Sequence, residues 1–285
     1  MSRFIVVAPG SSEAAALATD ELARVLGVAT VDALAGTTAT DAALRPASAL
    51  PAAVEAVRAA GDDALIAPAR ETSNRAFDHV AWNLNLAAST RAGVVLAFDA
   101  EGASAELLSE EIAAARLRAE AAAASVVAVI LTGGTPSLEV DVPVLTLPLS
   151  EDAAATLRAA ATPTAVTPLA FQADLIERAR ADRKRIVLPE PDDDRVLQAA
   201  AQVLAASIAD ITFVGDADYV AKRSGELGLD LSAAQVVSVD DPAYLERYAE
   251  EFARLRAKKG VTLEQARKKV TDVSYFGTMM VHMGD

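Results

Sequence analysis

The amino-acid sequence predicts an α/β fold made of two doubly wound parallel-sheet modules. Short runs of valine, isoleucine and leucine are apolar throughout, without the alternation expected of a strand that has one solvated face. Longer alanine-rich segments with charged residues at helical spacing separate these runs. Parallel strands joined by helices that cover both faces of a sheet produce this pattern. The pattern is interrupted once and then restarts, which indicates two modules.

In the first module, six apolar runs are expected to be strands, over residues 4–8, 30–33, 64–67, 93–98, 126–131 and 144–147. The first helix is expected to run from a cap at Ser11 or Ser12 to about Leu26, and the others are expected over 47–60, 74–89, 104–123 and 151–160. The helix over 104–123 has glutamates near its start and arginines towards its end, which matches the helix dipole. Trp82 is expected in the core.

The boundary between the modules is predicted at residues 161–168, where two prolines and three threonines break both helix and strand patterns. The first domain is therefore predicted over 1–160 and the second over 169–285. Strands of the second are expected over 185–188, 211–214 and 235–239, and helices over 169–180, 194–206, 217–227, 242–258 and 274–283. Gly260 is expected to end the helix over 242–258, and Thr262 with Gln265 is expected to form a capping box.

The charge balance excludes two classes of partner. The chain has 26 Lys and Arg residues against 40 Asp and Glu residues, a formal net charge of −14. Nucleic acid and anionic membrane surfaces would be repelled by this field, so neither is expected as a partner. There is no cysteine, hence no disulfide and no thiolate, and a reducing cytoplasm is the expected compartment.

Six stretches after about Val166 resemble, in order, the start of the domain shared by phosphate acetyltransferases and phosphate butyryltransferases. They are residues 167–171 (TPLAF), 176–180 (IERAR), 185–190 (RIVLPE) with Arg195, 208–215 (IADITFVG), 255–260 (LRAKKG) and 272–280 (DVSYFGTMM). The resemblance implies a reaction in which acetyl-CoA and phosphate give acetyl phosphate and coenzyme A. Coenzyme A and acetyl-CoA are then substrates, and no tightly bound cofactor or metal is expected.

The family's catalytic stretches would lie beyond Asp285, so the resemblance implies no catalytic residue in this chain. We therefore expect a chain truncated within the acetyltransferase domain and inactive by itself. The partners implied for the full-length protein are acetyl-CoA, phosphate and acetyl phosphate, and it is expected to be a homo-oligomer. The alternative is a non-catalytic acyl-CoA-sensing or oligomerisation module, because similar domains fused to malic enzymes serve regulation.

The first module resembles, more loosely, the dethiobiotin-synthetase type of P-loop domain that precedes the acetyltransferase domain in longer family members. A working P-loop needs Gly-x-x-x-x-Gly-Lys-Ser/Thr. Residues 8–16 (APGSSEAAA) have neither the second glycine nor the lysine, and Glu13 would repel a phosphate. The module is therefore expected to be a degenerate P-loop domain without nucleotide hydrolysis, in which Ser11 or Ser12 caps a helix rather than holding an anion.

Arg256 is the predicted site residue. It lies in a stretch that resembles one whose arginine is associated with coenzyme A in the family, and guanidinium groups bind phosphate oxygens in pairs. Lys258 and Lys259 add positive charge, and we include Lys259 as a candidate ligand of the same substrate. By spacing alone, these residues fit the cationic last turn of a helix.

Glu190 and Arg195 are further candidates, because they flank the end of a predicted strand, where open α/β sheets bind ligands. Arg195 is also expected to pair with one of three consecutive acids, Asp192–Asp194. A metal at these acids is less well supported than a solvated helix start, since no other ligands have matching spacing. His79 and His282 are expected to be packing or surface residues rather than bases.

Overall fold

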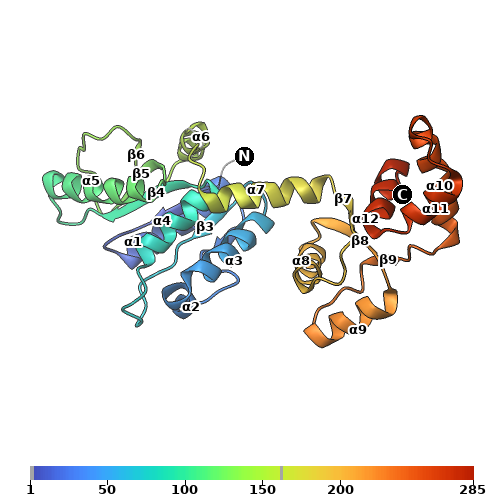
Figure 1. Cartoon of the computed structure of the whole chain (residues 1–285). Coiled ribbons are helices and arrows are strands. Elements are labelled where there is room, and N and C mark those ends of the chain that lie inside the picture. Colours follow the sequence, from blue (N-terminus) through green and yellow to red (C-terminus); the bar gives the residue numbers. More distant parts are fainter. Residues whose placement is uncertain (1–2, 161–162) are drawn as a thin grey trace. The chain divides into compact units, whose positions relative to one another are not determined.

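The computed structural model describes residues 3–160 and 163–285 and divides the chain into two compact units (Figure 1). Unit 1 ends at Ala173 and unit 2 begins at Asp174, so the division lies within helix α7 (Pro168–Ala181). The linker predicted over 161–168 includes two residues, 161 and 162, that lie outside the described residues. Its last residue, Pro168, is the first residue of α7, a position where proline costs no hydrogen bond.

Unit 1 contains a six-stranded parallel sheet, as the uninterrupted apolar runs predict. The strand order is β2-β3-β1-β4-β5-β6. The strands are β1 (Phe4–Val7), β2 (Thr30–Asp32), β3 (Leu65–Ala67), β4 (Gly93–Asp99), β5 (Val126–Thr132) and β6 (Val144–Thr146).

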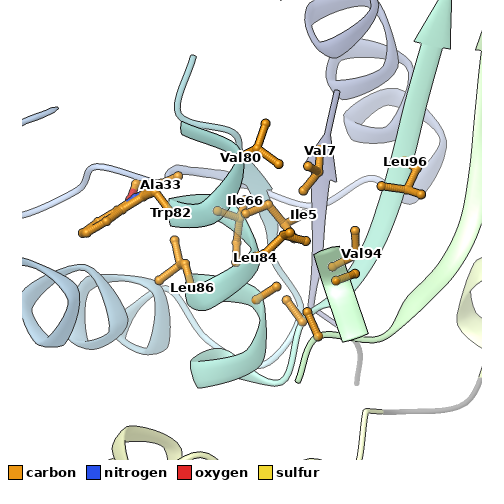
Figure 2. Close-up of a cluster of buried hydrophobic side chains, with 14 of the residues drawn as sticks. Ile5, Val7, Ala33, Ile66, Val80, Trp82, Leu84, Leu86, Val94 and Leu96 are labelled. Carbon is orange, nitrogen blue, oxygen red and sulfur yellow. The ribbon is translucent and has the colours of Figure 1, made fainter. Parts of the chain in front are cut away.

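Helices cover both faces of this sheet, which makes unit 1 doubly wound. One face packs on α1 (Ser12–Leu26) and α6 (Glu151–Ala159), and the other on α3 (Pro46–Ala59), α4 (His79–Thr90) and α5 (Ala105–Ala121). Figure 2 shows the second core, where side chains of α4 meet those of β1, β3 and β4. Trp82 is 6% exposed there and its Nε1 donates to the carbonyl of Ala33 at 2.9 Å, so its predicted core position is confirmed.

In unit 1, one helix was missed and the start of another was wrong. Helix α2 (Ala39–Leu44) was not predicted, because six residues are too few to show a helical period. The helix predicted from Asn74 begins only at His79. Asn74 instead accepts from the backbone N–H of Ala76, and the Asp78 side chain caps α4 by accepting from Ala81. The N-cap of α4 is therefore Asp78, four residues after Asn74, where the helix was predicted to begin.

Unit 2 contains a three-stranded parallel sheet of β7 (Lys184–Leu188), β8 (Ala209–Val214) and β9 (Gln235–Val237), in that order. Helices α8 (Asp194–Ala205) and α9 (Ala217–Leu227) cover one face around Leu197, Phe213 and Val220. The other face carries a core of Tyr248, Phe276 and their neighbours. It is built from α10 (Pro242–Arg256), α11 (Leu263–Val270) and α12 (Val273–Met283). Among the described residues no helix is long and apolar enough to cross a membrane.

Gly215 is the residue after β8, and it lies close to Pro191 in the connection between β7 and α8. A Cβ added to Gly215 would lie 2.6 Å from Cγ of the buried Pro191. We expect Gly215→Ala to destabilise unit 2 by about 1–3 kcal/mol through overpacking. Denaturant unfolding followed by tyrosine signals measures this change. Gly225→Ala in α9 is the control, because its Cβ meets nothing within 4 Å and alanine favours a helix; equal losses in both variants would contradict the expected contact.

Candidate functional site

Arg256 is the last residue of α10, at the point where the chain turns back on itself. The turn continues through a 3-10 segment, η1 (Ala257–Lys259), and ends at Gly260, whose φ of 70° is left-handed. The Thr262 side chain then accepts from the N–H of Gln265, and the Gln265 side chain accepts from the N–H of Thr262. The predicted helix end and the predicted capping box are both confirmed, although the α-helix stops at Arg256 rather than at Lys258.

A row of alternating charge and aromatic rings extends from Arg256. Its Cζ lies 5.8 Å from the ring centroid of Phe252, one helical turn earlier. That ring meets the ring of Tyr275 edge to face, with centroids 5.8 Å apart. The Nζ of Lys269 lies 4.0 Å from the centroid of Tyr275. We call Arg256, Phe252, Tyr275 and Lys269 the cation–aromatic row. Cations within about 6 Å of a ring centroid are attracted by the ring quadrupole.

Within the described residues, five positive charges in the region of this row have no carboxylate as an ion-pair partner. Elsewhere on α10 and α11, arginines have acidic partners at 2.6–2.7 Å: Arg247 with Asp285, Arg254 with Glu251, and Arg267 with Glu246. In contrast, five cations of the same region make no ion pair with any residue in the described part of the chain: Arg256, Lys258, Lys259, Lys268 and Lys269. In a protein with a net charge of −14, this local excess favours an anionic ligand.

Glu251 joins α10 to α12 beside the row. It accepts from Arg254 at 2.7 Å and lies 2.8 Å from Nε2 of His282. Hydrogen bonds from Arg254 and then His282 lower the pKa of Glu251 to about 2. His282 is therefore a surface residue tied to an acid, as the sequence predicts, while His79 begins α4 in the other unit.

The lowered pKa of Glu251 predicts acid sensitivity. Because the pKa falls from 4.5 in the unfolded chain to about 2 in the folded one, the ionised group stabilises unit 2 above pH 4.5. This contribution is lost as the pH falls from 4.5 towards 2. In Glu251→Gln, we expect the melting temperature to depend less steeply on pH across that window. Thermal unfolding at half-unit steps from pH 2 to pH 6 tests this, and unchanged slopes would contradict it.

Glu190 lies in the connection between β7 and α8, and Arg195 is the second residue of α8. Arg195 pairs with Asp193 at 2.6 Å, and this bond lowers the pKa of Asp193 to about 2. The predicted pairing of Arg195 with a neighbouring acid is thus confirmed. Glu190 is exposed. Among the described residues, no hydrogen bond or ion pair connects Glu190 or Arg195 with Arg256.

The three consecutive acids serve different partners. Asp193 caps α8, Asp194 pairs with Arg223 through two bonds of 2.8 and 2.5 Å, and Asp192 is exposed. They line an open cleft of about 670 Å³ with Tyr219 and Lys222. Within residues 3–160 and 163–285, no three His, Cys, Asp or Glu side chains are grouped so that they could hold a metal ion.

The strand–helix turn of unit 1 has the geometry of a cap. The Ser11 hydroxyl accepts from the N–H of Ala14 at 3.0 Å, which confirms the predicted cap. Glu13 is exposed in the first turn of α1. A carboxylate at this position interacts favourably with the helix dipole and would repel a bound phosphate. The turn therefore lacks the chemistry of a phosphate-binding loop.

The sequence singles out Arg256 as a candidate, but Phe252, Tyr275 and Lys269 were not predicted to lie beside it. The i, i+4 spacing of Phe252 and Arg256 was an available signal, because residues four apart on a helix are neighbours. Tyr275 and Lys269 lie on other helices, and no local pattern relates them to Arg256.

Comparison with known proteins matches unit 2 to one family. The family model described as phosphate acetyl/butaryl transferase matches residues 170–285. A phosphate acetyltransferase of Corynebacterium glutamicum is 51% identical over 115 residues, which are 40% of this chain and 35% of that protein. One of Nitratidesulfovibrio vulgaris is 44% identical over 120 residues, 42% of this chain and 17% of that protein. The chain thus spans about a third or less of these relatives.

Among solved structures, a phosphotransacetylase from Streptococcus pyogenes is 29% identical and aligns with a TM-score of 0.40. The alignment covers 42% of this chain and 36% of that one.

Proposed function

We propose that residues 170–285, which match the model of the phosphate acetyl/butaryl transferase family, bind coenzyme A or acetyl-CoA at the cation–aromatic row. The observation that carries the proposal is a group of five cations, Arg256 among them, that make no ion pair within the described residues of an acidic protein. Coenzyme A carries its negative charge on phosphates, and an arginine fork binds phosphate oxygens in pairs. Lys259, two residues after η1 begins, adds charge at the same turn.

The proposed reaction is that of the family, with coenzyme A as one of its two substrates. The thiol of coenzyme A attacks the carbonyl carbon of acetyl phosphate and the carbon–oxygen bond to phosphate breaks. Acetyl-CoA and orthophosphate are formed, and the thiol proton passes to the phosphate. The reverse direction gives acetyl phosphate. Cationic residues can contribute to this reaction in two ways: they position the two substrates, and they neutralise the charge of the phosphate. We place this chemistry in the cytoplasm, in a homo-oligomer of the full-length protein, with no tightly bound cofactor.

Replacing Arg256 tests the binding step. We expect Arg256→Ala to weaken coenzyme A binding tenfold or more, because a charge-assisted hydrogen bond contributes about 1.5–3 kcal/mol. Isothermal titration of coenzyme A into both proteins measures the change. Arg254→Ala is the matched control, since it lies two residues away and its charge is already neutralised by Glu251. Equal weakening in the two variants, or no binding by the unsubstituted chain, would overturn the proposal.

Turnover distinguishes the proposal from a non-catalytic acyl-CoA-sensing or oligomerisation module. The formation of acetyl-CoA from acetyl phosphate is followed by thioester absorbance. We expect the chain alone to bind coenzyme A with little or no turnover, and the full-length protein to catalyse the exchange. Binding by both with turnover by neither would favour the sensing module, and rapid turnover by the chain alone would contradict the assignment of no catalytic residue to it.

A further inference from the structure

Leu117 is a large apolar side chain on the solvent face of α5, in unit 1, and it has no part in the function proposed above. The buried face of α5 consists of Leu108, Ile112, Ala115 and Ala119. With about 3.6 residues per turn, Leu117 points away from these four residues. It is 67% exposed, and the residues one turn before and after it, Ala113 and Ala121, are exposed as well. The helix therefore presents an apolar surface to solvent in its second half.

An open groove of about 730 Å³ lies beside Leu117. Its walls come from three segments of unit 1: the second half of α5, the turn from α5 into β5, and the segment before α7. The apolar residues that line it are Ala113, Leu117, Ala123, Ala124, Val126 and Ala165. Arg116 and Glu120 line it too, so the groove combines an apolar floor with one charge of each sign.

The two charged residues of the groove can take further partners. Glu120 is exposed and makes no ion pair with any residue in the described part of the chain. Arg116 pairs with Asp141, but its side chain remains 35% exposed and a guanidinium group has five N–H donors. Arg223 in unit 2 shows that one arginine can serve two carboxylates, since it pairs with both Asp194 and Glu226.

The surface around Leu117 is complementary to itself. In two antiparallel helices related by a two-fold axis at Leu117, the residue four positions before it lies opposite the residue four positions after it on the other helix. Both residues are alanines, Ala113 and Ala121, whose small side chains allow the two helices to approach closely. Arg116 and Glu120 lie on one flank of α5, so Arg116 of each helix comes close to Glu120 of the other.

We propose that α5 docks on α5 of a second copy of this chain, with the two helices antiparallel and each Leu117 in the groove of the other copy. Two ion pairs between Arg116 and Glu120 flank this apolar contact. The proposal is independent of coenzyme A binding, because α5 lies outside residues 170–285. Either proposal can therefore fail without the other.

Sedimentation velocity of the full chain over a range of concentrations tests the contact. We expect the unsubstituted chain to form a dimer as its concentration rises, and Leu117→Glu to raise the dissociation constant more than tenfold, because a carboxylate replaces the central apolar side chain. Leu107→Glu is the matched control, since Leu107 is 48% exposed on the same helix but does not line the groove. A monomeric unsubstituted chain, or a dimer that Leu117→Glu leaves intact, would overturn the proposal.

Charge exchange tests the antiparallel arrangement. Glu120→Arg is expected to weaken the dimer, because Arg116 of the other copy then meets a like charge. Adding Arg116→Glu to the same chain exchanges the two signs and is expected to restore most of the affinity. If the double variant is no tighter than Glu120→Arg alone, the arrangement is wrong.

The absence of cysteine from the sequence permits a direct measurement of proximity. Leu117→Cys is expected to give covalent dimers with a short bismaleimide, whereas Leu107→Cys is expected to give few. Equal yields from the two variants would contradict a two-fold axis at Leu117. Tryptophan fluorescence of each variant verifies that these exposed substitutions leave unit 1 folded.

Discussion

Replacing Asn83 by alanine is expected to destabilise unit 1 by about 2–5 kcal/mol. The Asn83 side chain is 1% exposed and makes two hydrogen bonds with one residue, accepting from the N–H of Ala69 and donating to its carbonyl, both at 2.9 Å. Ala69 follows the end of β3, so its backbone has left the ladder and depends on this amide. Without Asn83, a buried donor and a buried acceptor lose their partners, at a cost of about 1–3 kcal/mol each.

The control for this prediction lies on the same helix. The Asn85 side chain donates to the carbonyl of Ala81, one turn earlier, and is exposed, so Asn85→Ala is expected to cost less than about 0.5 kcal/mol. Denaturant unfolding followed by tryptophan fluorescence measures both, because the single tryptophan, Trp82, belongs to the core of unit 1. A similar decrease of the free energy of unfolding in the two variants would show that the hydrogen bonds with Ala69 contribute little to stability.

Phe276→Ala is expected to destabilise unit 2 by about 3–5 kcal/mol. Phe276 is fully buried, and its ring lies edge to face with those of Tyr248 and Tyr244, at centroid distances of 5.0 and 6.3 Å. Truncation removes these contacts and leaves a cavity between α10 and α12. Val281→Ala on the same helix is the control, since Val281 is 68% exposed and its loss is expected to be small.

The distribution of aromatic residues allows each unit to be observed separately. All four tyrosines (Tyr219, Tyr244, Tyr248 and Tyr275) lie in unit 2, whereas the one tryptophan lies in unit 1. Each unit has its own hydrophobic cores. We therefore expect Phe276→Ala to shift the transition seen by tyrosine absorbance and to leave the tryptophan transition in place. A common shift of both transitions would contradict separate cores.

Much of the fold could be predicted because its strands are buried on both faces. In β4 and β5 nearly every residue is apolar and buried, and such runs stand out from the surrounding helices. Short elements carried no comparable signal. Helix α2 has one buried residue, Ala42. The start of α4 depends on whether Asn74 or Asp78 is the N-cap. Neither the hydrophobic pattern nor helix propensity decides which of two nearby polar residues caps a helix.

The candidate site could be predicted only in its local part. Arg256, Gly260 and the cap at Thr262 are features of one turn, and the sequence places them correctly. The contact between Lys269 and Tyr275 depends on how α11 packs against α12, which no spacing along the chain specifies. Arg195 illustrates the opposite case, since its partner Asp193 is two residues away and could be anticipated.

The central claim, that coenzyme A binds at the cation–aromatic row of unit 2, is tested most directly by hydrogen–deuterium exchange with and without coenzyme A. The account predicts slower exchange across residues 252–276, from the end of α10 to the start of α12, with unit 1 unchanged. It also predicts no change at residues 189–195, which comprise the β7–α8 connection and the start of α8 and contain the candidates Glu190 and Arg195. Protection at 189–195 or in unit 1, with none across 252–276, would contradict it.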